Sequence, residues 1–103
     1  MHQDHPLFLK SLNARLKVRL TFYSKGNAQR VTHTCAPLDF GISKGSTETS
    51  KRYHFWDFEG NQTLNLLSSQ VRHIEATTES FDPAAVVTWK PRWVLKRDWG
   101  DKS

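Results

Sequence analysis

The sequence predicts a mainly β protein: about five strands in a small barrel or a strongly bent antiparallel sheet, with a short N-terminal helix. Three observations lead to this prediction. Apolar and polar side chains alternate over residues 16–23 and 63–66, as in strands with one buried face. Aromatic side chains fall on both faces of an extended segment at 53–58. The apolar spacing changes near Arg15 from three and four residues to two, which marks the end of a helix.

The length of 103 residues suits one domain with a single core, so we expect residues 1–103 to form a single domain. Its core is expected over about 16–83. Residues 84–103 form a C-terminal tail that carries three of the four tryptophans. Removing apolar surface from water is worth roughly 25 cal/mol per Å². We therefore expect the tail to pack on the domain or on a partner.

The elements can be assigned in order along the chain. A helix is expected over 6–14, because Pro6 suits a first helical turn and Phe8 and Leu12 share one face. It would cover the sheet or plug one end of a barrel. Strands at 16–23 and 28–36 make the first hairpin, and Pro37 indicates an edge or a bend. The remaining elements are a short strand or strand continuation at 38–42, a polar mobile loop at 43–50, a second hairpin at 51–67, a tight turn at 68–70, a closing strand at 71–77 and an extended segment at 86–89.

The positive charge is concentrated in the first third of the chain. The net charge is +5, and the segment from His5 to Leu38 contains no carboxylate. The cations of that segment are Lys10, Arg15, Lys17, Arg19, Lys25 and Arg30. Such an excess suits polyanionic partners such as nucleic acid, nucleotides or an acidic protein surface. A solvated basic face that only maintains solubility is the alternative.

Six short motifs, spread over residues 16–83, resemble the WYL domain family in order and spacing. They are Leu20-Thr21-Phe22-Tyr23, Arg30-Val31, Cys35-Ala36-Pro37-Leu38, Arg52-Tyr53-His54-Phe55, the stretch from Leu66 to Val71, and Glu79-Ser80-Phe81. The resemblance implies an Sm-like or SH3-like β-barrel that senses a ligand, often a nucleic acid or nucleotide, and regulates an attached domain. Three features depart from the family pattern. Arg52-Tyr53-His54 replaces the Trp-Tyr-Leu triplet, polar residues around Asn65 and Gln70 replace the basic fourth strand, and the helix-turn-helix region that usually comes first is absent from this sequence.

Two clusters of basic and aromatic side chains are candidate ligand-binding sites. Aromatic rings stack on bases while arginine pairs with phosphate, and the first cluster consists of Arg52, Tyr53, His54 and Trp56. Basic side chains on one face of the first hairpin would contact phosphates, and these are Lys17, Arg19 and Arg30. Gln70, after the second hairpin, completes the candidate set. The alternatives are that the rings belong to the core or lie under the tail, and that the basic face is only solvated.

The sequence offers little for catalysis or metal binding. The five histidines lack the spacing of a metal site. A nucleophile pair of Cys35 and His33 would lack an orienting third group and an oxyanion hole. We therefore expect no catalytic residues, no metal and no cofactor. One cysteine, no signal peptide and no apolar run of roughly 20 residues predict a cytoplasmic protein without a membrane partner.

These observations predict a non-catalytic binding module that acts in regulation, including regulation of transcription. It would recognise a nucleic acid or a nucleotide-type ligand through its basic hairpin face and its aromatic strand. The second hypothesis is a protein-interaction subunit. In that case the exposed aromatic side chains and the Trp-rich tail would form a homo- or hetero-oligomer.

Overall fold

A computed structural model describes residues 2–42 and 50–103 of the chain. Its elements are α1 (His5–Ala14), β1 (Leu16–Ser24), β2 (Gln29–Gly41), β3 (Arg52–Asp57), β4 (Gln62–Leu66), β5 (Val71–Ser80), α2 (Pro83–Val86) and the 3₁₀ turn η1 (Gly100–Lys102). The predicted class, a mainly β chain with a short N-terminal helix, is confirmed. The loop expected at 43–50 lies, apart from Ser50, outside the described residues.

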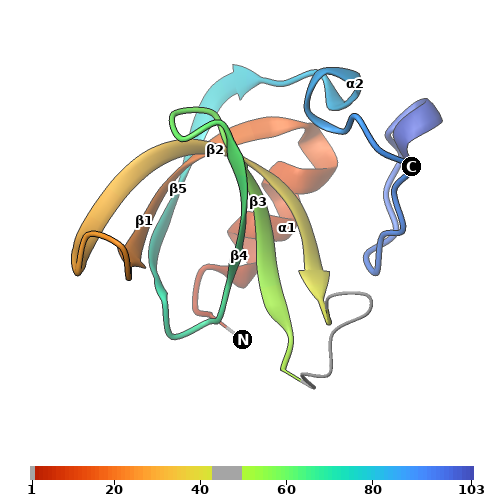
Figure 1. Cartoon of the computed structure of the whole chain (residues 1–103). Helices are drawn as coiled ribbons and strands as arrows, with labels where there is room; N and C mark the ends of the chain where they lie inside the picture. Colours follow the sequence, from red (N-terminus) through yellow and green to blue (C-terminus); the bar gives the residue numbers. More distant parts are fainter. Residues whose placement is uncertain (1, 43–49) are drawn as a thin grey trace.

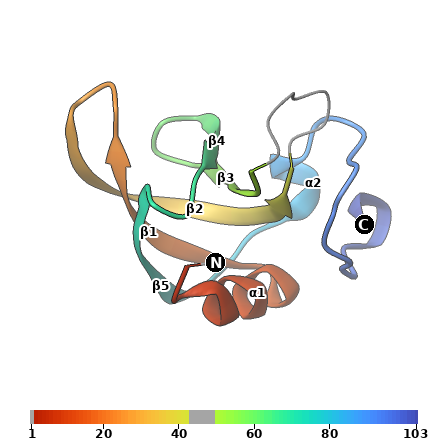
Figure 2. The same cartoon turned by 90° about the horizontal axis from the view of Figure 1, so that it is seen from below.

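The five strands form one antiparallel sheet in the order β4-β3-β2-β1-β5. The sheet is strongly bent, and α1 lies against one of its faces (Figures 1 and 2). Its edge strands β4 and β5 do not pair with each other in the described part of the chain, so the sheet stays open. Of the two predicted forms, the bent sheet is therefore found and the closed barrel is not.

Strand β2 is longer than predicted. It runs without interruption through Pro37 and lies in the middle of the sheet, between β3 and β1. A register shift separates Pro37 from Asp39 in the pairing with β3. Proline has no N–H to donate, so the regular ladder cannot continue through that position. Residues 38–41 are thus the continuation of the second strand, with the expected bend at the proline.

The extended segment predicted at 86–89 is wrong at Val86, which belongs to a helix. Asp82 accepts a hydrogen bond from the backbone N–H of Ala84 at 3.0 Å, and Pro83 follows directly. An acidic cap followed by proline favours a helical turn. Val86 is therefore the last residue of α2, and no strand follows it in the described residues.

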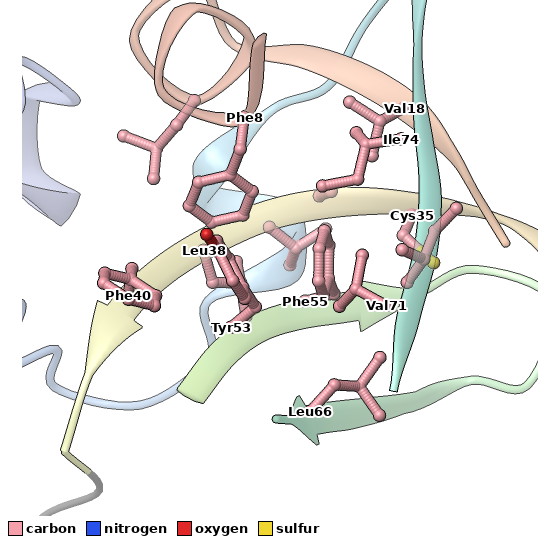
Figure 3. Packing of buried hydrophobic residues seen from close by; sticks show 14 of the residues in the cluster. Phe8, Val18, Cys35, Leu38, Phe40, Tyr53, Phe55, Leu66, Val71 and Ile74 are labelled. Atoms are coloured by element: carbon pink, nitrogen blue, oxygen red, sulfur yellow. The ribbon is translucent and has the colours of Figure 1, made fainter. Parts of the chain in front are cut away.

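The core fills the space between α1 and the sheet. Phe8 points from α1 toward the sheet (Figure 3), and its ring centroid lies 5.0 Å from Tyr53 and 5.3 Å from Phe55. Both rings meet Phe8 edge to face, a favourable arrangement for aromatic pairs. The helix ends where Arg15 adopts a left-handed conformation with φ of 57°, which turns the chain into β1.

The Trp-rich tail packs on its own domain, beside the end of β2 (Figures 1 and 2). Trp99 is 3% exposed, and its Nε1 donates to the carbonyl of Leu12 at 3.0 Å. Its ring also meets Phe81 edge to face at 5.5 Å. The first of the two expected positions of the tail is therefore the one found. Every helix in residues 2–42 and 50–103 is too short to cross a bilayer.

Candidate ligand-binding groove

A groove of about 760 Å³ lies between the outer face of β2, β3 and β4 and the C-terminal tail. It is lined by Leu38, Asp39, Ile42, His54, Thr63, Asn65, Trp89, Lys90, Arg92, Trp93 and Val94. Among the described residues, the large apolar side chains with the greatest exposure all belong to it: Ile42 at 47%, Trp89 at 40% and Val94 at 58%. Exposed apolar side chains gathered in one concave place favour a binding site over scattered surface.

The strand register brings three polar side chains together on the sheet side of the groove. His54 on β3 lies opposite Asp39 on β2 and opposite Asn65 on β4, so all three share the outer face. The His54 ring contacts Asn65 Oδ1 through Nδ1 at 2.6 Å and the carbonyl of Gly41 through Nε2 at 3.2 Å. Both partners are oxygen acceptors, so a neutral ring donates to one of them only, and the contact of Nδ1 with Asn65 is the shorter.

Asp39 binds the tail to the sheet through hydrogen bonds. Its carboxylate accepts hydrogen bonds from the backbone N–H of Val94 at 2.9 Å and of Leu95 at 3.0 Å. A third bond comes from Arg97 Nη2 at 3.2 Å. Asp39 is only 7% exposed, and bonds to a buried charged acceptor are stronger than bonds between neutral groups. One carboxylate on β2 therefore positions the tail wall of the groove.

Arg97 neutralises Asp39 from a fully covered position. Its guanidinium carbon lies 4.1 Å from the ring centroid of Trp93 and 4.5 Å from that of Trp99, so two indoles enclose it. It also donates to the carbonyl oxygens of Leu38 and Leu95. Burial lowers the pKa of Arg97 to about 10, against the opposing effect of Asp39, so the side chain stays charged at neutral pH.

Gly41 permits the close approach of the tail. A Cβ atom at this position would lie 2.6 Å from Val94 Cγ2 and 2.9 Å from Val94 Cβ. Any side chain at position 41 would therefore displace this part of the tail. Glycine at the end of β2 thus sets the distance between the two walls.

The groove carries a net positive charge. Lys90 and Arg92 have no ion pair in the described part of the chain, whereas the carboxylate of Asp39 is paired with Arg97. The field in the groove therefore comes mainly from the two unpaired cations, and it attracts anions.

The first predicted cluster, on β3, is divided between the groove and the core. His54 lines the groove. Arg52 and the partly buried Trp56 share its face of β3, and Arg52 Nη1 donates to the carbonyl of Asn65 at 3.3 Å. Tyr53 points the other way and is 0% exposed. Its hydroxyl contacts His5 Nδ1 at 2.8 Å, so this predicted contact residue offers no accessible ring to a ligand.

The second predicted cluster, on the first hairpin, is balanced by glutamates. Lys17 Nζ lies 3.5 Å from a carboxylate oxygen of Glu79, and Arg19 Nη1 lies 3.7 Å from one of Glu59. Both glutamates lie far along the sequence from their partners, outside the carboxylate-free segment from His5 to Leu38. The composition of that segment therefore did not indicate that its cations are paired. Arg30 is exposed and lies opposite Tyr23 near the far end of the hairpin.

Gln70 has a local structural role. Its Oε1 accepts a hydrogen bond from the backbone N–H of Leu67 at 3.0 Å and closes the turn between β4 and β5. It does not line the groove. Its predicted contact with a ligand finds no support in this geometry.

Cys35 and His33 are directed to other groups. Cys35 is 0% exposed, and burial, assisted by the nearby carboxylates of Asp57 and Glu59, raises the pKa of its thiol. His33 Nδ1 lies 2.7 Å from Asp57 Oδ2, which is itself fully buried. A thiol of this kind is a poor nucleophile, because the thiolate is the reactive form.

Sequence inspection missed the groove residues that come from the tail. Trp89, Lys90 and Arg92 were visible as an unusual Trp-rich and basic segment, but nothing in their spacing indicated which face of the sheet they meet. Asp39 carried no signal at all, since its partner Arg97 is 58 residues away.

Comparison with known proteins shows a shared fold. The chain is similar to part of proteasome accessory factor B/C (PafBC) of Arthrobacter aurescens, with a TM-score of 0.63 and 13% sequence identity. The match covers 81% of this chain and 12% of the PafBC chain, so this chain spans a small part of that protein's length. No family model matches the sequence, and no curated protein matches it.

Proposed function

We propose that this chain is a non-catalytic, WYL-like regulatory module that binds a nucleic acid or a nucleotide-type ligand in the groove. One observation carries the proposal: exposed apolar and aromatic side chains meet two unpaired cations in the same concave place. Trp89 presents a ring on which a base can stack. Lys90 and Arg92 present charge and donors to a phosphate.

One likeness supports the regulatory class and a second supports the fold. The motifs over residues 16–83 resemble the WYL family, whose members regulate an attached domain. The similarity to part of PafBC, at 13% identity, supports the fold. The tail lies outside the motifs that resemble the WYL family, which cover residues 16–83. The proposed site therefore moves from the first hairpin, where Lys17 and Arg19 are paired with glutamates, to the groove.

Fluorescence anisotropy with single-stranded DNA, single-stranded RNA and nucleotides over a salt series tests the proposal. Binding should strengthen as salt falls, because cations that contact phosphates release counterions. A double variant, Lys90→Gln with Arg92→Gln, should bind more weakly and with a salt slope lower by about two. Lys25→Gln, in the exposed turn between β1 and β2, is the matched control and should change neither quantity. If no probe binds at low salt, the proposal is wrong.

A protein-interaction subunit is the second candidate, and the same exposed side chains favour it. Ile42, Trp89 and Val94 are exposed apolar side chains that line the groove. Exposed apolar patches also mark protein interfaces. Size-exclusion chromatography with light scattering separates the two candidates. A stable oligomer that dissociates in a Val94→Asp variant would favour the interaction subunit.

A further inference from the structure

Hydrogen-bond donors predominate among the free polar groups of the groove. The Asp39 carboxylate already accepts three N–H groups of the tail. The side-chain oxygen of Asn65 is engaged by His54 Nδ1 at 2.6 Å, which leaves the NH₂ of the same amide as a donor. Lys90 and Arg92 only donate. An occupant that satisfies this lining is therefore rich in acceptors and negatively charged.

The aromatic lining provides one ring that is free for stacking. Trp93 lines the groove, but its ring lies 4.1 Å from the guanidinium carbon of Arg97, and its Nε1 donates to the carbonyl of Lys102 at 2.6 Å. Trp93 is thus a fixed part of the wall with one face occupied. Trp89 is 40% exposed and has no ring partner in the described part of the chain. Proteins that follow a strand over several nucleotides use successive rings, whereas residues 2–42 and 50–103 supply this groove with a single free indole.

Resting on the proposed function, we infer that the groove holds one nucleotide unit. The base stacks on Trp89 with its acceptors toward the Asn65 amide, and the phosphate lies beside Lys90 and Arg92. The volume of about 760 Å³ agrees with this, because sites for single small molecules measure roughly 300–1,000 Å³. A free nucleotide and the phosphorylated end of a strand share this chemistry, and the experiment below separates them.

Intrinsic tryptophan fluorescence and calorimetry on the full chain test the inference with five probes. They are adenosine 5′-monophosphate, adenosine, inorganic phosphate, and a single-stranded oligonucleotide with and without a 5′-phosphate. The monophosphate should bind with one-to-one stoichiometry and about tenfold or more tighter than adenosine, because only the monophosphate engages both cations. Trp89→Leu and Arg92→Gln should each weaken it about tenfold, with unchanged melting temperatures because both side chains are exposed. Lys25→Gln should bind as the wild type does.

The outcomes separate this inference from the proposed function. If the 5′-phosphorylated oligonucleotide binds and the Trp89→Leu change weakens it as it weakens the monophosphate, the site takes strand ends. If the monophosphate alone binds, the site takes free nucleotides. Both results support one nucleotide unit per groove. Equal affinity for adenosine and its monophosphate overturns the inference. The inference is also overturned if the oligonucleotide binds with the same affinity with and without its 5′-phosphate and to the Trp89→Leu variant. In that case the proposed function remains, but at another surface. Failure of every probe removes both.

Discussion

Asp39→Ala should release the C-terminal tail and weaken the whole fold. The change removes the acceptor of three hydrogen bonds from the tail and leaves Arg97 charged, with its side chain 0% exposed and no counterion within its site. Arg97 does not avoid this by losing its proton, because a guanidinium group stays charged in proteins at neutral pH. The protein must therefore either keep an unpaired buried charge or let water reach it.

The magnitude follows from which of these two responses is less costly. Three hydrogen bonds to a charged group, at about 1.5–3 kcal/mol each, set an upper bound that assumes a rigid tail. Removing one partner of a buried ion pair generally costs about 3–5 kcal/mol. Release of the tail would hydrate Arg97, but it would also expose Trp99 to water. Trp99 is only 3% exposed in the folded protein, so its apolar burial would be lost. We therefore expect the free energy of unfolding to fall by about 3 kcal/mol, at the lower end of that range.

Two measurements check this expectation. Urea denaturation gives the change in the free energy of unfolding, and limited trypsin digestion at Arg92 and Lys96 reports tail release. Asp98→Ala, which removes an exposed carboxylate from the same tail, is the control and should change both readouts little. If Asp39→Ala unfolds within about 0.5 kcal/mol of the wild type and keeps its resistance to trypsin, Asp39 does not hold the tail.

Three further expectations follow from single positions. Gly41→Ala should speed tryptic cleavage of the tail, because its Cβ would lie 2.6 Å from Val94 Cγ2. Gly26→Ala is the control and should not change the cleavage rate, because a Cβ there meets nothing within 4 Å. Equal digestion of the two variants would contradict the close approach of Val94 to Gly41. Burial lowers the pKa of His5 from 6.5, so the unfolded chain binds this proton more readily and stability should fall as pH drops below about 6.5. His5→Asn should flatten that fall in urea denaturation, and an unchanged pH profile would exclude this role. Cys35, 0% exposed with a raised thiol pKa, should react with a disulfide reagent only at the rate of unfolding, and rapid labelling of the native protein would show the core to be open.

Local patterns predicted those parts of the fold that depend on local forces. In β1, alternation alone placed Val18 and Leu20 on the buried face and Arg19 on the exposed face, and each lies there. Such a pattern is sufficient because a shift of one residue would expose every apolar side chain of the strand. The ends of β2 were less predictable, since Pro37 usually marks an edge but here lies in a central strand at a register shift.

The candidate site could not be derived in the same way. Alternation correctly put Tyr53 and His54 on opposite faces of β3, but it could not decide which face would be covered by α1. That choice depends on Phe8, which packs against Tyr53 across 45 residues of sequence. A ring that was expected to meet a ligand therefore belongs to the core, and its histidine neighbour lines the groove instead.

The same long-range docking determines the charge of the groove. Without the tail, the outer face of β2 would present Asp39 without its partner Arg97. With the tail in place, Arg97 neutralises that carboxylate, and the same segment adds Lys90 and Arg92. The tail thus adds positive charge at the point where it supplies its aromatic wall. Anion binding and tail docking should consequently stabilise each other, since an anion that binds only the docked form shifts the equilibrium toward that form.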